Sequence, residues 1–333
     1  MFIIGNYSVA VIFCIITMLC WGSWANTQKL AAKTWRFELF YWDYVMGILL
    51  FSLISAFTLG SFGAEGRSFL NDLKQADISS IGNAFLGGII FNAANILIAA
   101  AIAVAGMSVA FPVGIGIALI LGVLVNYITA AKGNAYLLFS GVILIAIAIL
   151  LNAIAYNRKN QAGKKISEKG IVLAIIGGIL MSFFYRFIAV SMDMENFHQP
   201  AAGKMTPYTA VFIFSVGIFL SNFLFNTILI KKPFSGEPAR YADYFNGKFK
   251  THLVGVLGGL IWGIGNSFNL IAAGKAGPAI SYGLGQGATL VAALWGVFIW
   301  KEFSDAPKGT NSLITAMFIL FIAGLVLLVY AGR

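Results

Sequence analysis

The chain has 333 residues, of which 59% are hydrophobic and 10% charged, and its formal net charge at pH 7 is +10. Soluble domains carry about 25% charged and roughly 45–50% apolar residues, so the composition excludes an ordinary water-soluble protein. The positive charge does not indicate a nucleic-acid partner, because the Lys and Arg residues lie in connections between long apolar blocks. That placement is typical of the loops of a membrane protein.

The apolar blocks are about 20 residues long, the length that crosses roughly 30 Å of hydrocarbon. They predict an all-α integral membrane protein with ten transmembrane helices. Pro207 and Pro278 lie near the first turns of their helices, where a missing N–H costs little. The predicted helices cover residues 7–27, 38–60, 80–103, 107–129, 133–156, 169–192, 206–230, 252–274, 278–300 and 310–331.

The distribution of basic residues predicts the orientation. Fifteen Lys and Arg residues lie in the connections after the first, third, fifth, seventh and ninth helices, and six lie on the opposite side. Cytoplasmic loops carry the excess of positive charge. Both termini are therefore expected outside the cell, with the bilayer as the surrounding solvent.

An internal repeat is visible in the sequence. Gly87–Ile128 aligns without a gap on Gly258–Ile299, at an offset of 171 residues, and Asn95 then coincides with Asn266. Two Gly-rich apolar stretches also match by chance, but an ungapped run over two helices that includes Asn favours a true repeat. With five helices in each half, the second copy must be inverted relative to the first.

The predicted organisation is therefore two inverted five-helix repeats. Residues 1–156 form the first repeat, 157–168 a cytoplasmic linker and 169–333 the second repeat. Inverted repeats place a solute site at their interface near the bilayer midplane and support alternating access by rocking.

Polar side chains inside the apolar blocks must be hydrogen-bonded or face water. Asn, Gln, Tyr and Trp without a compensating charge suit a neutral, hydrogen-bonding, partly planar solute. The alternative for any single residue is a hydrogen bond between helices, worth about 0.6 kcal/mol on average. The predicted substrate-binding residues are Trp21, Asn92, Asn95, Trp262, Asn266, Tyr282, Gln286 and Thr289.

Two charged residues lie inside predicted helices. A charge in the membrane costs at least about 2.5 kcal/mol on insertion scales, so Asp43 and Arg186 are functional candidates. Asp43 is expected to bind and release the coupled proton, with Arg186 as a second charged member of the coupling site. The alternative is that Asp43 reaches the interface beside Tyr41 and Trp42, and that Arg186 reaches the outer boundary.

The chain lacks the motifs of enzymes and ATP-driven pumps. His198 and His252 lie at loop or helix ends without metal-ligand spacing, and there is no HExxH motif and no phosphate-binding loop. We expect a protein that is not an enzyme and that holds neither a metal nor a cofactor.

Several stretches resemble the ureide permease family. The stretches in the first half are CWGSW (Cys20–Trp24), WDYVMGILL (Trp42–Leu50) and the Gly-rich Ala105–Tyr127. The second half continues in the family's order with WGIGNSFNLIAAGKAG (Trp262–Gly277) and GQGATLVAALWGVFIWKEF (Gly285–Phe303). The similarity covers nearly the whole chain. It implies the fold of the drug/metabolite transporter superfamily, with ten helices in two repeats, as in the related glucose/ribose and rhamnose porters. The motif residues that match are Trp21, Gly22, Asp43, Asn266 and, loosely, Gly285 and Gln286.

The resemblance implies proton-coupled import of a small neutral polar metabolite, either a sugar or a ureide or nucleobase, with H⁺ or alternatively Na⁺ as the coupled ion. The alternative is a drug or metabolite exporter of the same fold, although an exporter of cations is expected to carry an acidic residue near the midplane. A third possibility, a sensor or scaffold, predicts an added soluble domain. The connection between the fifth and sixth helices is shorter than in plant members, which predicts a bacterial protein of the inner membrane. The sequence indicates neither the particular solute nor the oligomeric state.

Overall fold

A computed structural model of the chain describes residues 1–333 apart from 33, 64, 106–109, 161–166 and 235. Part of the predicted linker and the start of the fourth predicted helix, with Gly106 of the repeat alignment, lie outside the described residues. The helices are α1 (Tyr7–Ser23), α2 (Ala25–Ala31), α3 (Phe37–Phe57), α4 (Phe69–Gln75), α5 (Ile78–Ala105), η1 (Phe111–Ile115), α7 (Gly116–Thr129), α8 (Ala135–Asn160), α9 (Glu168–Ser191), α10 (Pro207–Lys231), α11 (Tyr241–Phe245), α12 (Phe249–Ala276), α13 (Pro278–Gly285), α14 (Ala288–Leu294), η2 (Trp295–Ile299) and α15 (Thr310–Ala331).

Nine helical segments among the described residues are long and apolar enough to cross a bilayer, and the helix Val113–Thr129 is a shorter apolar one. They occupy the places of the predicted spans, which makes the protein an integral membrane protein. Capping side chains and prolines mark several helix starts. At the start of α1, the Asn6 side chain accepts a hydrogen bond from the Val9 N–H. Pro207 and Pro278 begin α10 and α13, as predicted. The short helices α4 and α11 lie in polar connections where no helix was predicted.

The predicted span over 278–300 is present as the apolar segment Pro278–Ile299, but it is not a regular α-helix throughout. The segment is divided into α13, α14 and η2, with Gln286 and Gly287 between the first two. At this break the Gly287 N–H bonds to the Leu284 carbonyl three residues back, which is tighter than the α-helical spacing. The first span also changes at Trp24, where α1 ends and α2 follows. Discontinuous helices of this kind are common at the substrate sites of transporters.

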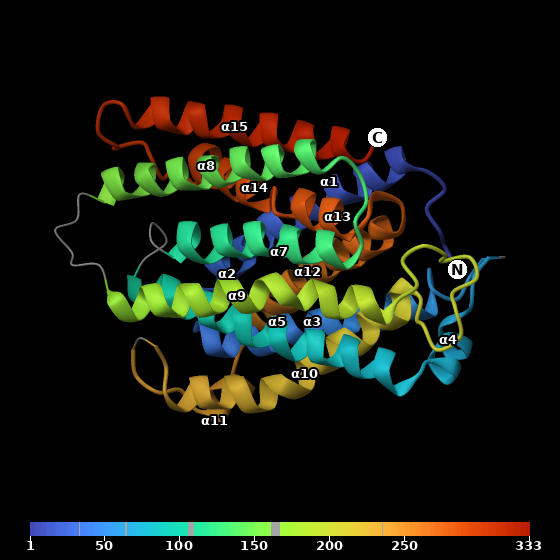
Figure 1. Ribbon diagram of the computed structural model, residues 1–333. Helices are drawn as coiled ribbons and strands as arrows, with labels where there is room; N and C mark the ends of the chain where they lie inside the picture. The colour runs from blue at the N-terminus through green and yellow to red at the C-terminus, as the bar shows by residue number, and fades with distance from the viewer. Residues whose placement is uncertain (33, 64, 106–109, 161–166, 235) are drawn as a thin grey trace.

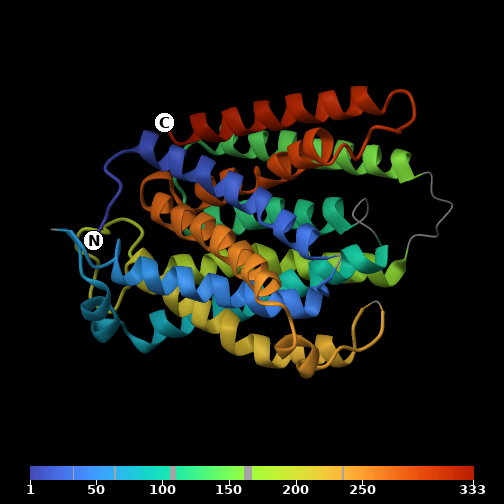
Figure 2. The ribbon, with the colours of Figure 1, turned by 180° about the vertical axis from the view of Figure 1, so that it is seen from behind.

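The long helices form one bundle and run roughly along a common direction (Figure 1). α8 and α15 pack side by side along one edge, and α10 lies at the opposite edge with α11 beside its end (Figures 1 and 2). Between these edges α12 packs against α1 and α3, while α5 packs against α9 and α10. The N- and C-termini lie at the same end of the bundle (Figure 1).

Two helix crossings bring backbones into direct contact. A Cβ atom on Gly259 of α12 would lie 2.8 Å from the Cα atom of Gly47 on α3. A Cβ atom on Gly217 of α10 would lie 3.3 Å from the Cα atom of Gly88 on α5. Only glycine permits such close approach, which is how membrane helices gain packing contacts without a hydrophobic driving force.

Candidate functional site

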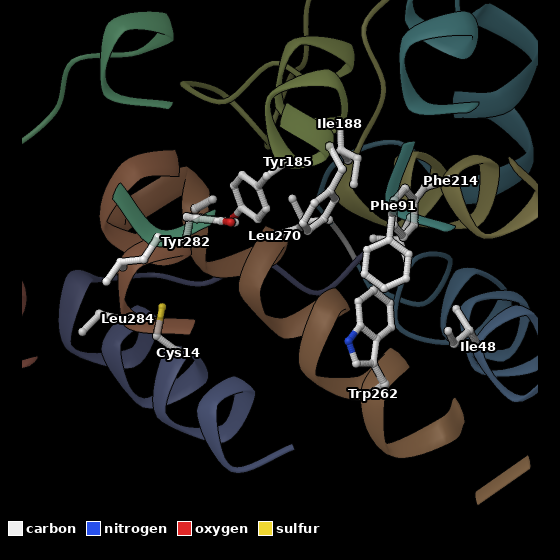
Figure 3. Packing of buried hydrophobic residues seen from close by; sticks show 14 of the residues in the cluster. Cys14, Ile48, Phe91, Tyr185, Ile188, Phe214, Trp262, Leu270, Tyr282 and Leu284 are labelled. Carbon is white, nitrogen blue, oxygen red and sulfur yellow. The ribbon is translucent and has the colours of Figure 1, made fainter. Parts of the chain in front are cut away.

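The centre of the bundle is filled by aromatic rings around Trp262, which is 5% exposed. The Phe91 ring lies 4.4 Å from the Trp262 ring, centroid to centroid, with the planes 35° apart, and Figure 3 shows the two rings next to each other. Trp21 stacks on Trp262 at 5.9 Å with the planes 12° apart. Tyr44 and Phe214 complete the cluster at 6.5 and 6.3 Å. Aromatic rings therefore occupy the region where the sequence predicts a solute site.

Buried polar atoms without a partner surround these rings. Both amide atoms of Asn266, which is 1% exposed, lack a hydrogen bond, and so do Nε1 of Trp21 and the hydroxyl of Tyr44. Asn266 follows Trp262 by one helical turn on α12, so the two share a face. An unpaired buried polar group costs about 1–3 kcal/mol. These donors and acceptors are therefore not satisfied by protein groups.

The break between α13 and α14 adjoins the same region. A Cβ atom on Gly285 would lie 2.7 Å from the Trp21 ring, so that ring packs directly on the end of α13. Gln286 is half-buried at the break, and the Thr289 hydroxyl donates to the Gln286 carbonyl over 2.9 Å. Of the predicted binding residues, the structure thus brings Trp21, Trp262 and the Gln286 segment together.

Asn92 and Asn95 are linked to each other through Tyr41, which is fully buried. The Tyr41 hydroxyl donates to Asn92 Oδ1 over 2.9 Å and accepts from Asn95 Nδ2 over 3.1 Å. Asn92 also donates to the Ser221 hydroxyl on α10 over 2.9 Å. These amides make the interhelical hydrogen bonds that the sequence analysis held as the alternative to solute binding.

Tyr282 makes packing contacts in this state. Its hydroxyl donates to the backbone carbonyls of Ala118 and Met181, over 3.1 and 3.3 Å, and its ring lies against Gly122. In Figure 3 Tyr282 lies beside Tyr185 and away from Trp262. Its hydroxyl is therefore satisfied by protein groups.

Asp43 is buried, with 2% exposure. The Tyr244 hydroxyl donates to its Oδ1 over 2.7 Å, and the Trp35 indole N–H donates to its Oδ2 over 3.3 Å. His252 Nδ1 lies 2.9 Å from Oδ1 and 3.0 Å from Oδ2. Arg186 is exposed on α9, so the structure does not place the two predicted coupling residues together.

Sequence reasoning set His252 aside because it lacks metal-ligand spacing, and it did not single out Tyr244, Trp35 or the hydroxyl of Tyr44. The signal in the sequence is Gly255, which follows His252 by three residues in the same apolar helix. In the structure a Cβ atom on Gly255 would lie 3.2 Å from Asp43 Oδ2, so this glycine allows α3 to approach α12.

Two grooves on the bundle are apolar and hold none of the predicted site residues. One, of about 480 Å³, is lined by α1, α13 and α15 side chains such as Cys14, Met18 and Leu325. The other, of about 440 Å³, lies between α7 and α8 and includes Leu124 and Phe139. Apolar grooves on the outside of a membrane bundle suit lipid chains rather than a polar solute.

The bundle of apolar helices, its discontinuous span and its uncharged central cluster define a multi-pass membrane transporter rather than an enzyme. The family model "Ureide permease" matches residues 40–169 and 164–331. The chain therefore belongs to the ureide permease family, as its sequence motifs predicted.

Full-length relatives agree with this assignment. Ureide permease 1 and Ureide permease 2 of Arabidopsis thaliana are each 24% identical, with 98% of both chains covered. Transmembrane protein 144 homolog A of Dictyostelium discoideum is 29% identical over 51% of this chain and 41% of its own. A solved crystal structure with 14% identity has the same fold, with a TM-score of 0.62 over 97% of this chain and 96% of that one.

Proposed function

We propose that the protein imports a small, neutral, polar and partly planar metabolite by alternating access, coupled to protons. A ureide is the substrate class that the names of the plant relatives suggest, and a nucleobase and a sugar are the other candidates. The observation that carries the proposal is the Asn266 amide, which is buried with both polar atoms unpaired one turn from the stacked Trp262 and Trp21 rings. Planar heterocycles stack on such rings and present both donors and acceptors to an amide.

The solute would enter when the central rings part. Aromatic stacking supplies affinity for a planar molecule without charge, and the Asn266 amide and Trp21 Nε1 supply directional hydrogen bonds. Asn92, Asn95, Tyr282, Gln286 and Thr289 would then complete or support the cavity between the halves. Nothing in the comparisons favours the exporter alternative.

An inverted repeat supports the alternating-access part of the proposal. The first and last residues of α12 (Phe249–Ala276) each lie 171 residues after the first and last residues of α5 (Ile78–Ala105). This is the offset of the sequence repeat. The helix crossings correspond as well: Gly259 contacts α3 of the first half, and Gly88 contacts α10 of the second half. Reciprocal contacts of this kind, from each half to the other, are expected when two halves are related by a two-fold axis in the membrane plane.

The count of ten spans and the orientation belong to the same proposal. Both termini lie at one end of the bundle, which requires an even number of crossings. Including α7 with η1 as a span makes ten. The excess of Lys and Arg then places the end with α2 and α11 in the cytoplasm and both termini outside. A bacterial inner membrane stays a prediction from the short connection between α8 and α9.

The test uses purified protein in liposomes with an imposed inward pH gradient. Uptake of radiolabelled allantoin, uracil and glucose is measured for the wild type and for Asn266→Leu. We expect accumulation of at least one of these probes, which collapses when the gradient is dissipated, and at least a tenfold loss in Asn266→Leu. The matched control is Asn126→Leu, another buried asparagine, whose amide bonds to Gly122 of its own helix. Equal uptake by Asn266→Leu and the wild type would refute the proposed role of Asn266 in binding the solute. Wild-type protein that accumulates none of the probes would refute the proposed substrate class.

A further inference from the structure

The contacts of Asp43 join four segments of the chain. Asp43 lies on α3, Trp35 precedes that helix, Tyr244 lies on α11 and His252 lies in the first turn of α12. The rings enclose the imidazole: Trp35 and Tyr244 make edge contacts with His252 at 5.0 and 4.8 Å. The carboxylate and the imidazole are therefore held in one geometry by two aromatic side chains.

The hydrogen bonds assign the protons of this cluster. A carboxylate has about four lone-pair positions, and the Tyr244 hydroxyl and the Trp35 N–H donate to opposite oxygens of Asp43. Burial and the bond to Asp43 raise the pKa of Tyr244, so its hydroxyl keeps its proton at neutral pH. His252 Nδ1 faces both oxygens, which makes the Nδ1–H tautomer the one that fits. Any additional proton then binds at Nε2, and the imidazole becomes an imidazolium beside Asp43.

Exposure places the route for proton exchange on the same ring. The His252 side chain is 21% exposed and the Asp43 side chain 2%. Nε2 faces the backbone of Gly247, where a Cβ atom would be 2.6 Å from it. The imidazole is therefore partly exposed, while its carboxylate partner stays buried.

Asp43 and Tyr244 are the titratable groups in contact with the imidazole from α3 and α11. On its own side of the chain, Lys248 and Lys250 flank His252 and are exposed. Imidazole is the side chain whose ordinary pKa places its charge change between pH 5 and 8. The imidazole is thus the more exposed member of the pair and the one with a second ring nitrogen that can bind a proton.

We infer that His252 is the proton-binding group of the transporter and that Asp43 is its fixed counterion. The inference rests on the proposed proton coupling and deepens it, because it moves the exchangeable proton from Asp43 to His252. The protonated pair is an ion pair that ties α12 to α3 and α11. Loss of the Nε2 proton leaves a single hydrogen bond to a neutral ring, which loosens this end of the bundle.

The proton site is tested first without transport. The chain has two histidines, so NMR of protein labelled in the imidazole rings gives two titration curves, and His198→Gln assigns them. We expect His252 to titrate between pH 5 and 9 and its midpoint to fall by one pH unit or more in Asp43→Asn, which removes the counterion. A His252 signal that does not titrate between pH 4 and 9, or one that Asp43→Asn leaves unchanged, overturns the inference.

The coupling role is tested in liposomes with allantoin and uracil as probes. His252→Gln keeps a donor for Asp43 but cannot become charged, so we expect it to exchange labelled for unlabelled probe while losing at least tenfold in accumulation driven by a pH gradient. The matched control is His198→Gln, because His198 also lies 3.0 Å from a carboxylate, that of Glu65, but is exposed. Normal driven accumulation by His252→Gln overturns the inference. If the wild type moves neither probe, the proposed function fails, while a His252 titration that depends on Asp43 still supports the proton site.

Discussion

The crossing of α3 and α12 offers a sharp test of the packing, because Gly259→Ala adds one methyl group where two backbones touch. The new Cβ atom would lie 2.8 Å from both Gly47 Cα and Ile48 N, whereas ordinary contacts begin at 3.4 Å. The nearest atom is the Tyr44 carbonyl oxygen, with which the new Cβ atom would collide. All three atoms are backbone and cannot turn aside, so the helices must move apart. Overpacking of this kind costs about 1–3 kcal/mol. We expect Gly259→Ala to lower the melting temperature of the detergent-solubilised protein and to reduce transport.

The matched control is Gly82→Ala on α5, where a Cβ atom would meet nothing within 4 Å. In that position alanine is expected to be neutral or slightly stabilising, because glycine in a helix costs about 0.5–1 kcal/mol relative to alanine. Melting is followed by intrinsic fluorescence for both variants. A Gly259→Ala protein whose melting temperature equals that of the wild type, or is no lower than that of Gly82→Ala, would refute the close crossing.

Two further predictions concern hydrogen bonds. Tyr41→Phe removes the donor to Asn92 and the acceptor for Asn95, and we expect it to destabilise the protein by about 1 kcal/mol. The check is a double-mutant cycle with Asn92→Leu, in which strictly additive effects would contradict the shared network. For Glu302, burial acts to raise the pKa, but hydrogen bonds from Lys29 and the Tyr156 hydroxyl lower it overall. A depressed pKa means that the stabilisation is present above the unfolded-state value of about 4.3 and is lost as the pH falls through the folded-state value. The difference in melting temperature between the wild type and Glu302→Gln should therefore be constant from pH 7 to about pH 5 and shrink below about pH 4; a difference that persists at the lowest pH would contradict the pairing.

The amino-acid sequence by itself determined the class, the family and the approximate positions of the membrane-spanning helices. These follow from local properties: about 20 consecutive apolar residues, proline in a first turn, and motif residues such as Trp21 and Asp43. The break at Gln286 was missed because glycines are common in continuous membrane helices as well. Whether Gly285 and Gly287 interrupt a helix depends on the neighbouring rings, and hydropathy does not report on those.

Only the tertiary structure decided which polar side chains meet. Asp43 and His252 are 209 residues apart, and Tyr41 and Asn92 are 51 apart. Hydropathy and spacing describe a residue's own helix, whereas these contacts depend on how helices distant in the sequence pack against each other. For the same reason Asn92 is satisfied and Asn266 is not, although both are asparagines inside apolar segments. The packing of neighbouring helices supplied a partner to one amide and none to the other.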